Sequence, residues 1–230
     1  DGRGVVVIRG ESELGNMLPV DSLVEEYVPL QKELAILLAR AQDGSMQVYP
    51  VIEMVFDPRA QICSSVCAPA RIPEGVATQC RNLAIAAVNA LEGVGVFAVE
   101  LFWAMDGRVL INEIAPRPHN SGHWTIEGAV TNQFEQHIRA VCGLPLGSAE
   151  LLRPSVMVNL LGEPGSAGAP SLQGVEEALG LPGLKIHWYQ KESVSGLRKM
   201  GHFTVTAATI EEALALAAKA QSCLSVQGSR

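Results

Sequence analysis

Two glutamates, Glu100 and Glu113, lie on either side of a predicted β-hairpin turn at Asp106-Gly107. Asp-Gly is a strong two-residue hairpin turn because both central positions need positive φ. Counting outward from the turn places Glu100 opposite Glu113, on one face of the hairpin. Like charges in such a pair repel by roughly 1 kcal/mol in water and about 4 kcal/mol in a partly dry site at ~4 Å. We therefore expect a cation between them, and two carboxylates with room for phosphate oxygens suit magnesium.

The residues around the glutamates indicate that the hairpin strands are buried. The same count pairs Phe102 with Ile111 and places Val109 and Ile111 on the glutamate face, with Leu110 on the other. Both faces are then apolar, and buried carboxylates need partners. These flanks argue against the alternative, a solvated hairpin face on which the pair costs little.

Composition excludes several classes of protein. The 230 residues are 48% hydrophobic and 18% charged, which supports a sizeable core and excludes wholesale disorder. The net charge of -7 predicts no general attraction to nucleic acid. No apolar run reaches the ~20 residues that cross a bilayer, so we expect no membrane partner. Five cysteines without a C-x-x-C spacing favour free thiols in a reducing compartment over a zinc site.

The elements that must position the glutamates follow from periodicity and turn residues. They predict an α+β fold with an antiparallel sheet and packed helices. Expected strands or extended stretches cover 5–8, 22–28, 33–40, 47–55, 61–67, 155–161, 185–189 and 199–206. Expected helices cover 74–91, 132–142 and a segment near 173–179, and a last helix follows the capping box Thr209-x-x-Glu212.

The remaining segments are expected to be irregular. We predict a glycine-rich loop at 1–4, a turn at Asp43-Gly44, a loop at 162–170 and a frayed tail at 227–230. In the second helix, Phe134, Ile138 and Val141 share one face. A boundary at 143–154 divides the chain into domains 1–150 and 151–230, the second a small C-terminal α/β subdomain.

The run NEIAPRPHNSGHWT, residues 112–125, closely resembles the ATP-grasp enzyme 5-(carboxyamino)imidazole ribonucleotide synthase of purine biosynthesis. Three further segments support the resemblance, which runs across essentially the whole chain: EEYV at 25–28, HWYQK at 187–191 and LRKMGH at 197–202. The resemblance implies an ATP-grasp fold in which this chain starts at the mobile glycine loop. The family's first domain and the subdomain with the phosphate-binding lysine would then be absent, so we expect little turnover from this chain alone.

The family's reaction is the one that the resemblance implies. ATP, bicarbonate and 5-aminoimidazole ribonucleotide give the N-carboxylated ribonucleotide, ADP and phosphate, through carboxyphosphate, with magnesium or manganese. The resemblance also implies a homodimer, fused in some organisms to the mutase that acts next. We expect a soluble, cytoplasmic protein, with a plastid as the alternative because any leader would lie upstream of Asp1.

The nucleotide and metal contacts are carried over from the family. Glu100 and Glu113 would hold the metal, Glu25 and Val28 the adenine, and Glu33 the ribose hydroxyls. Asn112 is adjacent to the metal glutamate, yet strict alternation points it to the opposite face. Either the strand bends there or Asn112 does not touch the metal. From spacing alone, an ordinary strand end is favoured for Glu25 and Val28, and it is as compatible with Glu33 as the ribose contact is.

The chemical and substrate contacts are carried over in the same way. Arg117 would hold bicarbonate or carboxyphosphate in its guanidinium fork. His119 and Asn120 would meet bicarbonate or the ribonucleotide, with His119 as a proton carrier. Lys191 and Arg198 would hold the substrate phosphate, although a solvated basic turn would look the same.

Two departures and two rivals remain. Ala115 stands where the wider superfamily often has a metal-binding Asn, and Phe56 stands where many relatives have a nucleotide-contacting His. One rival is formate-dependent glycinamide ribonucleotide transformylase, which typically has Asp at the position of Asn120. The other is a non-catalytic nucleotide-binding module.

Overall fold

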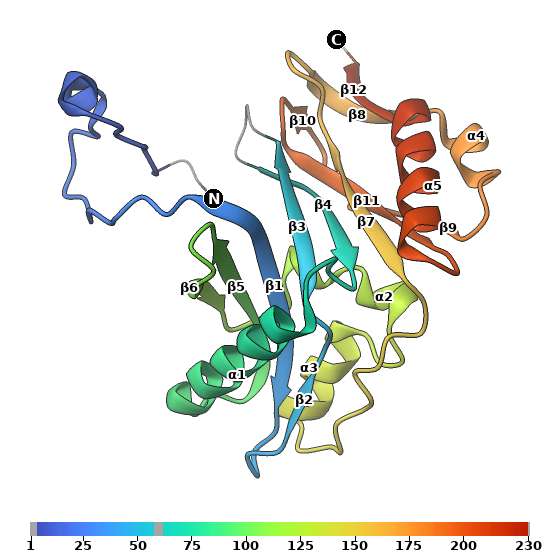
Figure 1. Ribbon diagram of the computed structural model, residues 1–230. Coiled ribbons are helices and arrows are strands. Elements are labelled where there is room, and N and C mark those ends of the chain that lie inside the picture. The colour runs from blue at the N-terminus through green and yellow to red at the C-terminus, as the bar shows by residue number, and fades with distance from the viewer. Residues whose placement is uncertain (1–3, 58–61, 230) are drawn as a thin grey trace.

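One antiparallel sheet forms the centre of the computed structural model, which describes residues 4–57 and 62–229 (Figure 1). The strand order is β6-β5-β1-β3-β4-β7-β11-β9, with β2 paired to β1, and a separate three-stranded sheet has the order β10-β8-β12. The strands are β1 Leu30–Arg40, β2 Met46–Val48, β3 Ile52–Asp57, β4 Ile62–Ala68, β5 Gly95–Ala104, β6 Val109–Ala115, β7 Ser155–Leu161, β8 Ala167–Gln173, β9 Leu184–Trp188, β10 Val194–Ser195, β11 Lys199–Thr206 and β12 Ser225–Ser229.

Helices pack on both faces of this sheet, and the predicted α+β fold with an antiparallel sheet and packed helices is confirmed. They are α1 Glu74–Leu91, α2 Thr125–Gly128, α3 Gln133–Val141, α4 Val175–Leu179 and α5 Ile210–Cys223, with 3-10 turns at Glu11–Asn16 and Asn120–Gly122. A line of directly paired residues runs from Leu34 through Glu53 and Cys67 to Val156. Leu34 packs in the α1 core and Val156 in the α5 core, so α1 and α5 share one face. The segment from 116 to 131, α2 and α3 cover the other.

The sheet continues across the predicted domain boundary, because β4 pairs directly with β7. Separate apolar cores nevertheless lie beneath α1 and beneath α4 and α5. The division into 1–150 and 151–230 stays a prediction. Among the described residues, no helix is both long enough and apolar enough to span a bilayer.

The two most N-terminal strand predictions were wrong. Residues 5–8 and 22–28 form no strand, and residues 4–29 make an arm that extends from the body of the molecule (Figure 1). Leu23 and Val24 are 86% and 83% exposed there. Their β-branched and apolar composition predicted strands, but a strand needs a neighbour for its backbone groups, and the described residues supply none. Residues 1–3, and residue 61 of another predicted strand, lie outside the described residues.

Near the C-terminus, the frayed tail and part of the predicted loop 162–170 were also wrong. Residues 225–229 form β12, which pairs with β8. Gly228 is required at this pairing, because a Cβ there would lie 1.9 Å from the carbonyl oxygen of Ala167. The loop prediction rested on glycine, proline and serine content, but residues 167–170 belong to β8, the central strand of the three-stranded sheet.

Helix α3 is oriented differently from what its apolar residues indicate. Phe134, Ile138 and Val141 are 43%, 56% and 41% exposed, whereas Gln133 and Gln136 are completely buried. The helix begins where predicted, with the Asn132 side chain accepting hydrogen bonds from the first turn. Its buried face is therefore partly polar, and the two glutamines bond to the backbone of neighbouring loops.

Candidate active site

The β5–β6 hairpin brings Glu100 opposite Glu113, as predicted, but by a different register. The turn has three residues rather than two: Ala104 and Arg108 close it through the Ala104 N–H and the Arg108 carbonyl, 2.9 Å apart. This shifts the pairing by one residue, and a β-bulge at Asn112 shifts it back before Glu113. The two differences cancel at the glutamates.

Between the turn and the bulge, the predicted pairing was wrong. Phe102 pairs with Leu110 instead of Ile111, and Ile111 pairs with Leu101. Val109 and Ile111 therefore pack in the α1 core, on the face away from the glutamates. The bulge bends the strand at Asn112, which is the first of the two alternatives considered for this residue. Asn112 is exposed next to Glu113.

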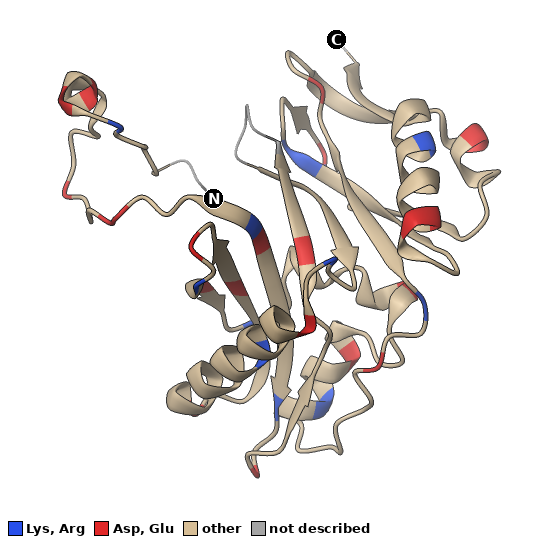
Figure 2. Cartoon of the chain, in the orientation of Figure 1, with Lys and Arg blue, Asp and Glu red and all other residues tan. Residues whose placement is uncertain are grey.

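Three acidic side chains share this face of the sheet. Glu33 on β1 pairs with Phe102, which is two residues from Glu100 and therefore on the same face, and Figure 2 shows acidic positions on β1 and β5. Burial first, then the charges of Glu113 and Glu33, raise the pKa of Glu100 to about 7. Burial also raises the pKa of Glu33. Glu100 and Glu113 each have a ligand atom within 4.8 Å of the other and of a ring nitrogen of His119.

His119 faces the carboxylates from the loop that follows β6. Its Nδ1 lies 3.6 Å from Glu100 Oε1 and 2.9 Å from Ser121 Oγ, and it accepts a hydrogen bond from the Ser121 backbone N–H. Burial, together with the charges of Arg117 and Lys199, lowers the pKa of His119 to about 4. The ring is therefore neutral at pH 7. The Arg117 guanidinium is exposed and donates to the Pro118 carbonyl at 3.2 Å.

Asn120 is bonded on both sides of its carboxamide to residues that the sequence did not single out. Its Nδ2 donates to Asn159 Oδ1 at 2.8 Å, and its Oδ1 accepts from Asn159 Nδ2 at 2.9 Å and from Lys199 Nζ at 3.0 Å. Asn159 also donates to the Cys63 carbonyl. This network ties the loop after β6 to β4, β7 and β11. Lys199 lies close enough to Glu100 for its charge to act on that carboxyl.

The predicted phosphate-binding pair lies beside Lys199. Lys191 Nζ donates to the Lys199 carbonyl, and burial with the charges of Arg198 and Lys199 lowers the pKa of Lys191. Arg198 is exposed and donates to the Ser193 carbonyl at 2.8 Å. The three cations form one basic cluster at the start of β11, where Figure 2 shows Lys and Arg. The structure thus brings Lys191 and Arg198 together and adds Lys199.

The predicted adenine contacts lie apart from this cluster. Glu25 and Val28 belong to the arm, where Glu25 is exposed. The arm meets the hairpin where the Pro29 carbonyl accepts from the Met105 N–H at 2.8 Å. Phe56 packs against the core cluster that contains Met54. Met54 pairs with Glu33, so Phe56 lies on the same face of the sheet as Glu33.

Two further histidines, His187 and His202, have polar partners. His187 Nε2 lies 2.7 Å from Glu127 Oε1, and His202 stacks between His187 and His123 at ring distances of 4.5 and 4.7 Å. The Tyr189 hydroxyl lies 2.9 Å from His202 Nδ1. This stack joins α2 to β9 and β11.

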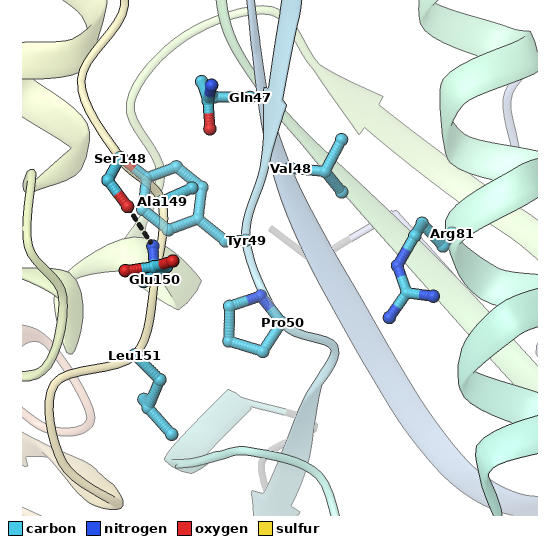
Figure 3. A pocket seen from close by; sticks show the side chains of 9 residues that line it. All are labelled: Gln47, Val48, Tyr49, Pro50, Arg81, Ser148, Ala149, Glu150 and Leu151. Carbon is cyan, nitrogen blue, oxygen red and sulfur yellow. Dashed lines mark hydrogen bonds between the residues drawn. The ribbon is translucent and has the colours of Figure 1, made fainter.

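A shallow depression of about 550 Å³ lies away from the glutamates, between β2, α1 and residues 148–151 (Figure 3). Arg81 points into it from α1, and Tyr49 and Glu150 line it. None of the predicted site residues contributes to this depression. The arrangement of charges, rather than the hollow, therefore locates the candidate active site.

Comparisons with known proteins identify the family of the chain. Residues 1–134 match the ATP-grasp domain family, and residues 155–216 match the phosphoribosylaminoimidazole carboxylase C-terminal domain family. The N5-carboxyaminoimidazole ribonucleotide synthase of Bacillus subtilis is 38% identical over 208 residues, covering 89% of this chain and 53% of that protein. The chain spans about half the length of the curated relatives it matches.

Solved structures give the same result. The N5-carboxyaminoimidazole ribonucleotide synthetase of Thermotoga maritima has a TM-score of 0.91 at 50% identity, covering 97% of this chain and 60% of that one. The Aspergillus clavatus synthase, in complex with ADP and 5-aminoimidazole ribonucleotide, has a TM-score of 0.77 at 37% identity, covering 85% and 52%. The resemblance inferred from residues 112–125 is confirmed. The chain belongs to the ATP-grasp family, and its relatives there are N5-carboxyaminoimidazole ribonucleotide synthases.

Proposed function

We propose that the full-length protein containing this chain carboxylates 5-aminoimidazole ribonucleotide at the expense of ATP, in de novo purine biosynthesis. A bicarbonate oxygen takes the γ-phosphoryl group of ATP and releases ADP. The ribonucleotide amine then attacks the carboxyl carbon of carboxyphosphate, phosphate leaves, and the amine loses a proton. The observation that carries this proposal is the Glu100–Glu113 pair, which faces across the hairpin and is followed along the chain by Arg117 and His119.

The carboxylate pair fits a divalent cation. The pKa of Glu100 is raised because its charge is buried near those of Glu113 and Glu33, so a cation would relieve the repulsion. Nδ1 of His119 is already bonded to Ser121, which leaves the two carboxylates as the ligands. When bound there, magnesium or manganese would neutralise charge on the nucleotide phosphates.

The other residues of the chain bind and orient. Glu33 is the proposed contact of the ribose hydroxyls, and Glu25, Val28 and Asn112 are the remaining proposed nucleotide contacts. Arg117 holds bicarbonate or carboxyphosphate through its exposed guanidinium. Lys191 and Arg198 hold the phosphate of the ribonucleotide.

His119 and Asn120 stand beside the reacting groups. His119 is proposed to carry the proton that the amine loses on carboxylation. Asn120 holds Lys199 through its carboxamide oxygen and is proposed to meet bicarbonate or the ribonucleotide from that position.

The test is ADP release by the full-length protein, with each component omitted in turn. We expect release that needs magnesium, bicarbonate and 5-aminoimidazole ribonucleotide together. Stimulation by formate and glycinamide ribonucleotide instead would establish the transformylase rival, and nucleotide binding without turnover would establish the binding-module rival. The proposed homodimer is tested by light scattering of the same protein. A fused mutase and a cytoplasmic or plastid location are proposals for its complete reading frame.

A further inference from the structure

Gln133, the first residue of α3, holds the backbone of His119 at two points. Its Oε1 accepts a hydrogen bond from the His119 N–H at 2.9 Å, and its Nε2 donates to the His119 carbonyl at 2.8 Å. The Gln133 side chain is completely buried, so water does not compete for these bonds. Two bonds to one residue fix both its position and its orientation, which a single bond does not do.

Further contacts hold the loop close to Gln133. The Gln133 N–H donates to Thr125 Oγ1 at 3.0 Å, and Thr125 Oγ1 donates to the Gly122 carbonyl at 2.6 Å. A Cβ on Gly122 would lie 2.3 Å from Gln133 Oε1 and 2.4 Å from Leu37 Cδ2, so only glycine allows this approach. Gln133 Nε2 also lies 3.0 Å from His123 Nδ1. This contact uses the second hydrogen of the Gln133 amide group.

We propose that Gln133 is a positioning residue of the reaction, acting through the backbone of His119. The inference rests on the proposed function, since it assigns Gln133 to the geometry of that same site. His119 lies beside Glu100, and Arg117 and Asn120 lie on either side of it along the chain. Groups in a reaction must be held within about 0.5 Å of their working positions, and a shift of about 1 Å costs on the order of 10²-fold in rate. Releasing His119 would move all three loop residues.

One turn further along α3, Gln136 provides a matched control. It is also completely buried, its Nε2 donates to the Gly147 carbonyl at 2.7 Å, and its Oε1 accepts from the Gly147 N–H at 2.8 Å. The same side chain thus makes the same pair of bonds on the same helix. Gly147 lies in the connection to β7 and not in the candidate site.

The experiment compares Gln133→Met with Gln136→Met in the full-length protein. Both should lower the Tm, because each removes two buried hydrogen bonds to loop backbone, and Gln133→Met should lower it somewhat more because it also removes the contact with His123 Nδ1. Gln133→Met should lower kcat for ADP release with bicarbonate and 5-aminoimidazole ribonucleotide by 10- to 100-fold and leave the KM for ATP within twofold. Gln136→Met should keep kcat within threefold. Equal losses of kcat in the two variants would show that the effect is structural and would overturn the inference.

Hydrogen exchange tests the contact without relying on turnover. The His119 amide should lose its protection in Gln133→Met and keep it in Gln136→Met, whereas unchanged protection in both would overturn the inference. If the wild-type protein lacks the carboxylation activity, the proposed function fails while this measurement still reports on Gln133. Should Gln133→Met not fold, Gln133→Glu replaces it, with Gln136→Glu as its control. Glu keeps an acceptor for the His119 N–H, places an oxygen against the His119 carbonyl, and is expected to lower kcat in the same range.

Discussion

Replacing Glu113 by Gln should stabilise the metal-free chain and abolish its response to magnesium. Glu113→Gln keeps the shape of the side chain and removes one of the two charges that face each other across the hairpin. The ligand atoms lie within 4.8 Å of one another. At that separation the repulsion is about 0.9 kcal/mol in bulk water and about 3.5 kcal/mol at an effective dielectric constant of 20. Because Glu113 is exposed and Glu100 is not, we expect a gain of about 1–2 kcal/mol at pH 8.

Urea denaturation of this chain in EDTA, and again with magnesium, measures both effects. In EDTA the midpoint for Glu113→Gln should exceed that of the wild type at pH 8. At pH 4, where Glu100 is protonated in both proteins, the difference should vanish. With magnesium at 100 times its Kd, the wild type should gain about 2.7 kcal/mol and the variant much less. Glu150→Gln, at an exposed position outside the site, serves as the control and should stay within about 0.5 kcal/mol. A variant no more stable than the wild type in EDTA, or equally stabilised by magnesium, would refute the reasoning.

Three further predictions concern the same network. The pKa of Glu100 is raised from 4.5 to about 7, so the folded state holds this proton more tightly than the unfolded state does. The stability in EDTA should therefore be fully present below about pH 4.5 and fall by about 3 kcal/mol as the pH rises through 7. A flat urea midpoint over that window would contradict this prediction. Arg198→Ala in the full-length protein should raise the KM for 5-aminoimidazole ribonucleotide at least about tenfold, the range of a charge-assisted hydrogen bond, with the KM for ATP within twofold; equal increases in steady-state assays would remove Arg198 from the phosphate site. Asn159→Leu should cost about 1–3 kcal/mol in urea denaturation, because it leaves Asn120 Nδ2 without its acceptor. An unchanged midpoint would show that this pair contributes nothing.

The carboxylate pair could be predicted because it depends on local register. Asp106-Gly107 marks a turn, and counting from it reaches Glu113 opposite Glu100. The count nevertheless assumed a two-residue turn, and Asp-Gly also suits the three-residue turn that is present, with Gly107 at φ 87°. The bulge at Asn112 restores the pairing, and no turn rule predicts it. The face assigned to Ile111, between turn and bulge, was accordingly wrong.

The residues missed by the sequence reasoning depend on distant contacts. Asn159 and Lys199 are 39 and 79 positions away from Asn120, to which they bond. Lys199 lies in the basic run 197–202, but nothing in the local sequence distinguishes it from an ordinary surface lysine. A β-bulge between Lys199 and Gly201 interrupts the pairing with β7 at this point, so alternation along β11 could not have assigned its direction either.

Helix α3 shows that polar contacts, rather than hydrophobic spacing, decide how this helix is oriented. Phe134 and Ile138 share one face as predicted, and burying them would contribute roughly 1.5–3 kcal/mol each. In the observed orientation of α3 those side chains are partly exposed, but Gln133 and Gln136 make four buried hydrogen bonds to loop backbone. A loop that carries functional groups cannot satisfy its own backbone in a helix or sheet ladder, and an unpaired buried N–H or C=O costs about 1–3 kcal/mol. The two buried glutamines are therefore a consequence of placing the His119 loop over the sheet, and a buried glutamine next to an irregular loop points to the residue that the loop must hold in place.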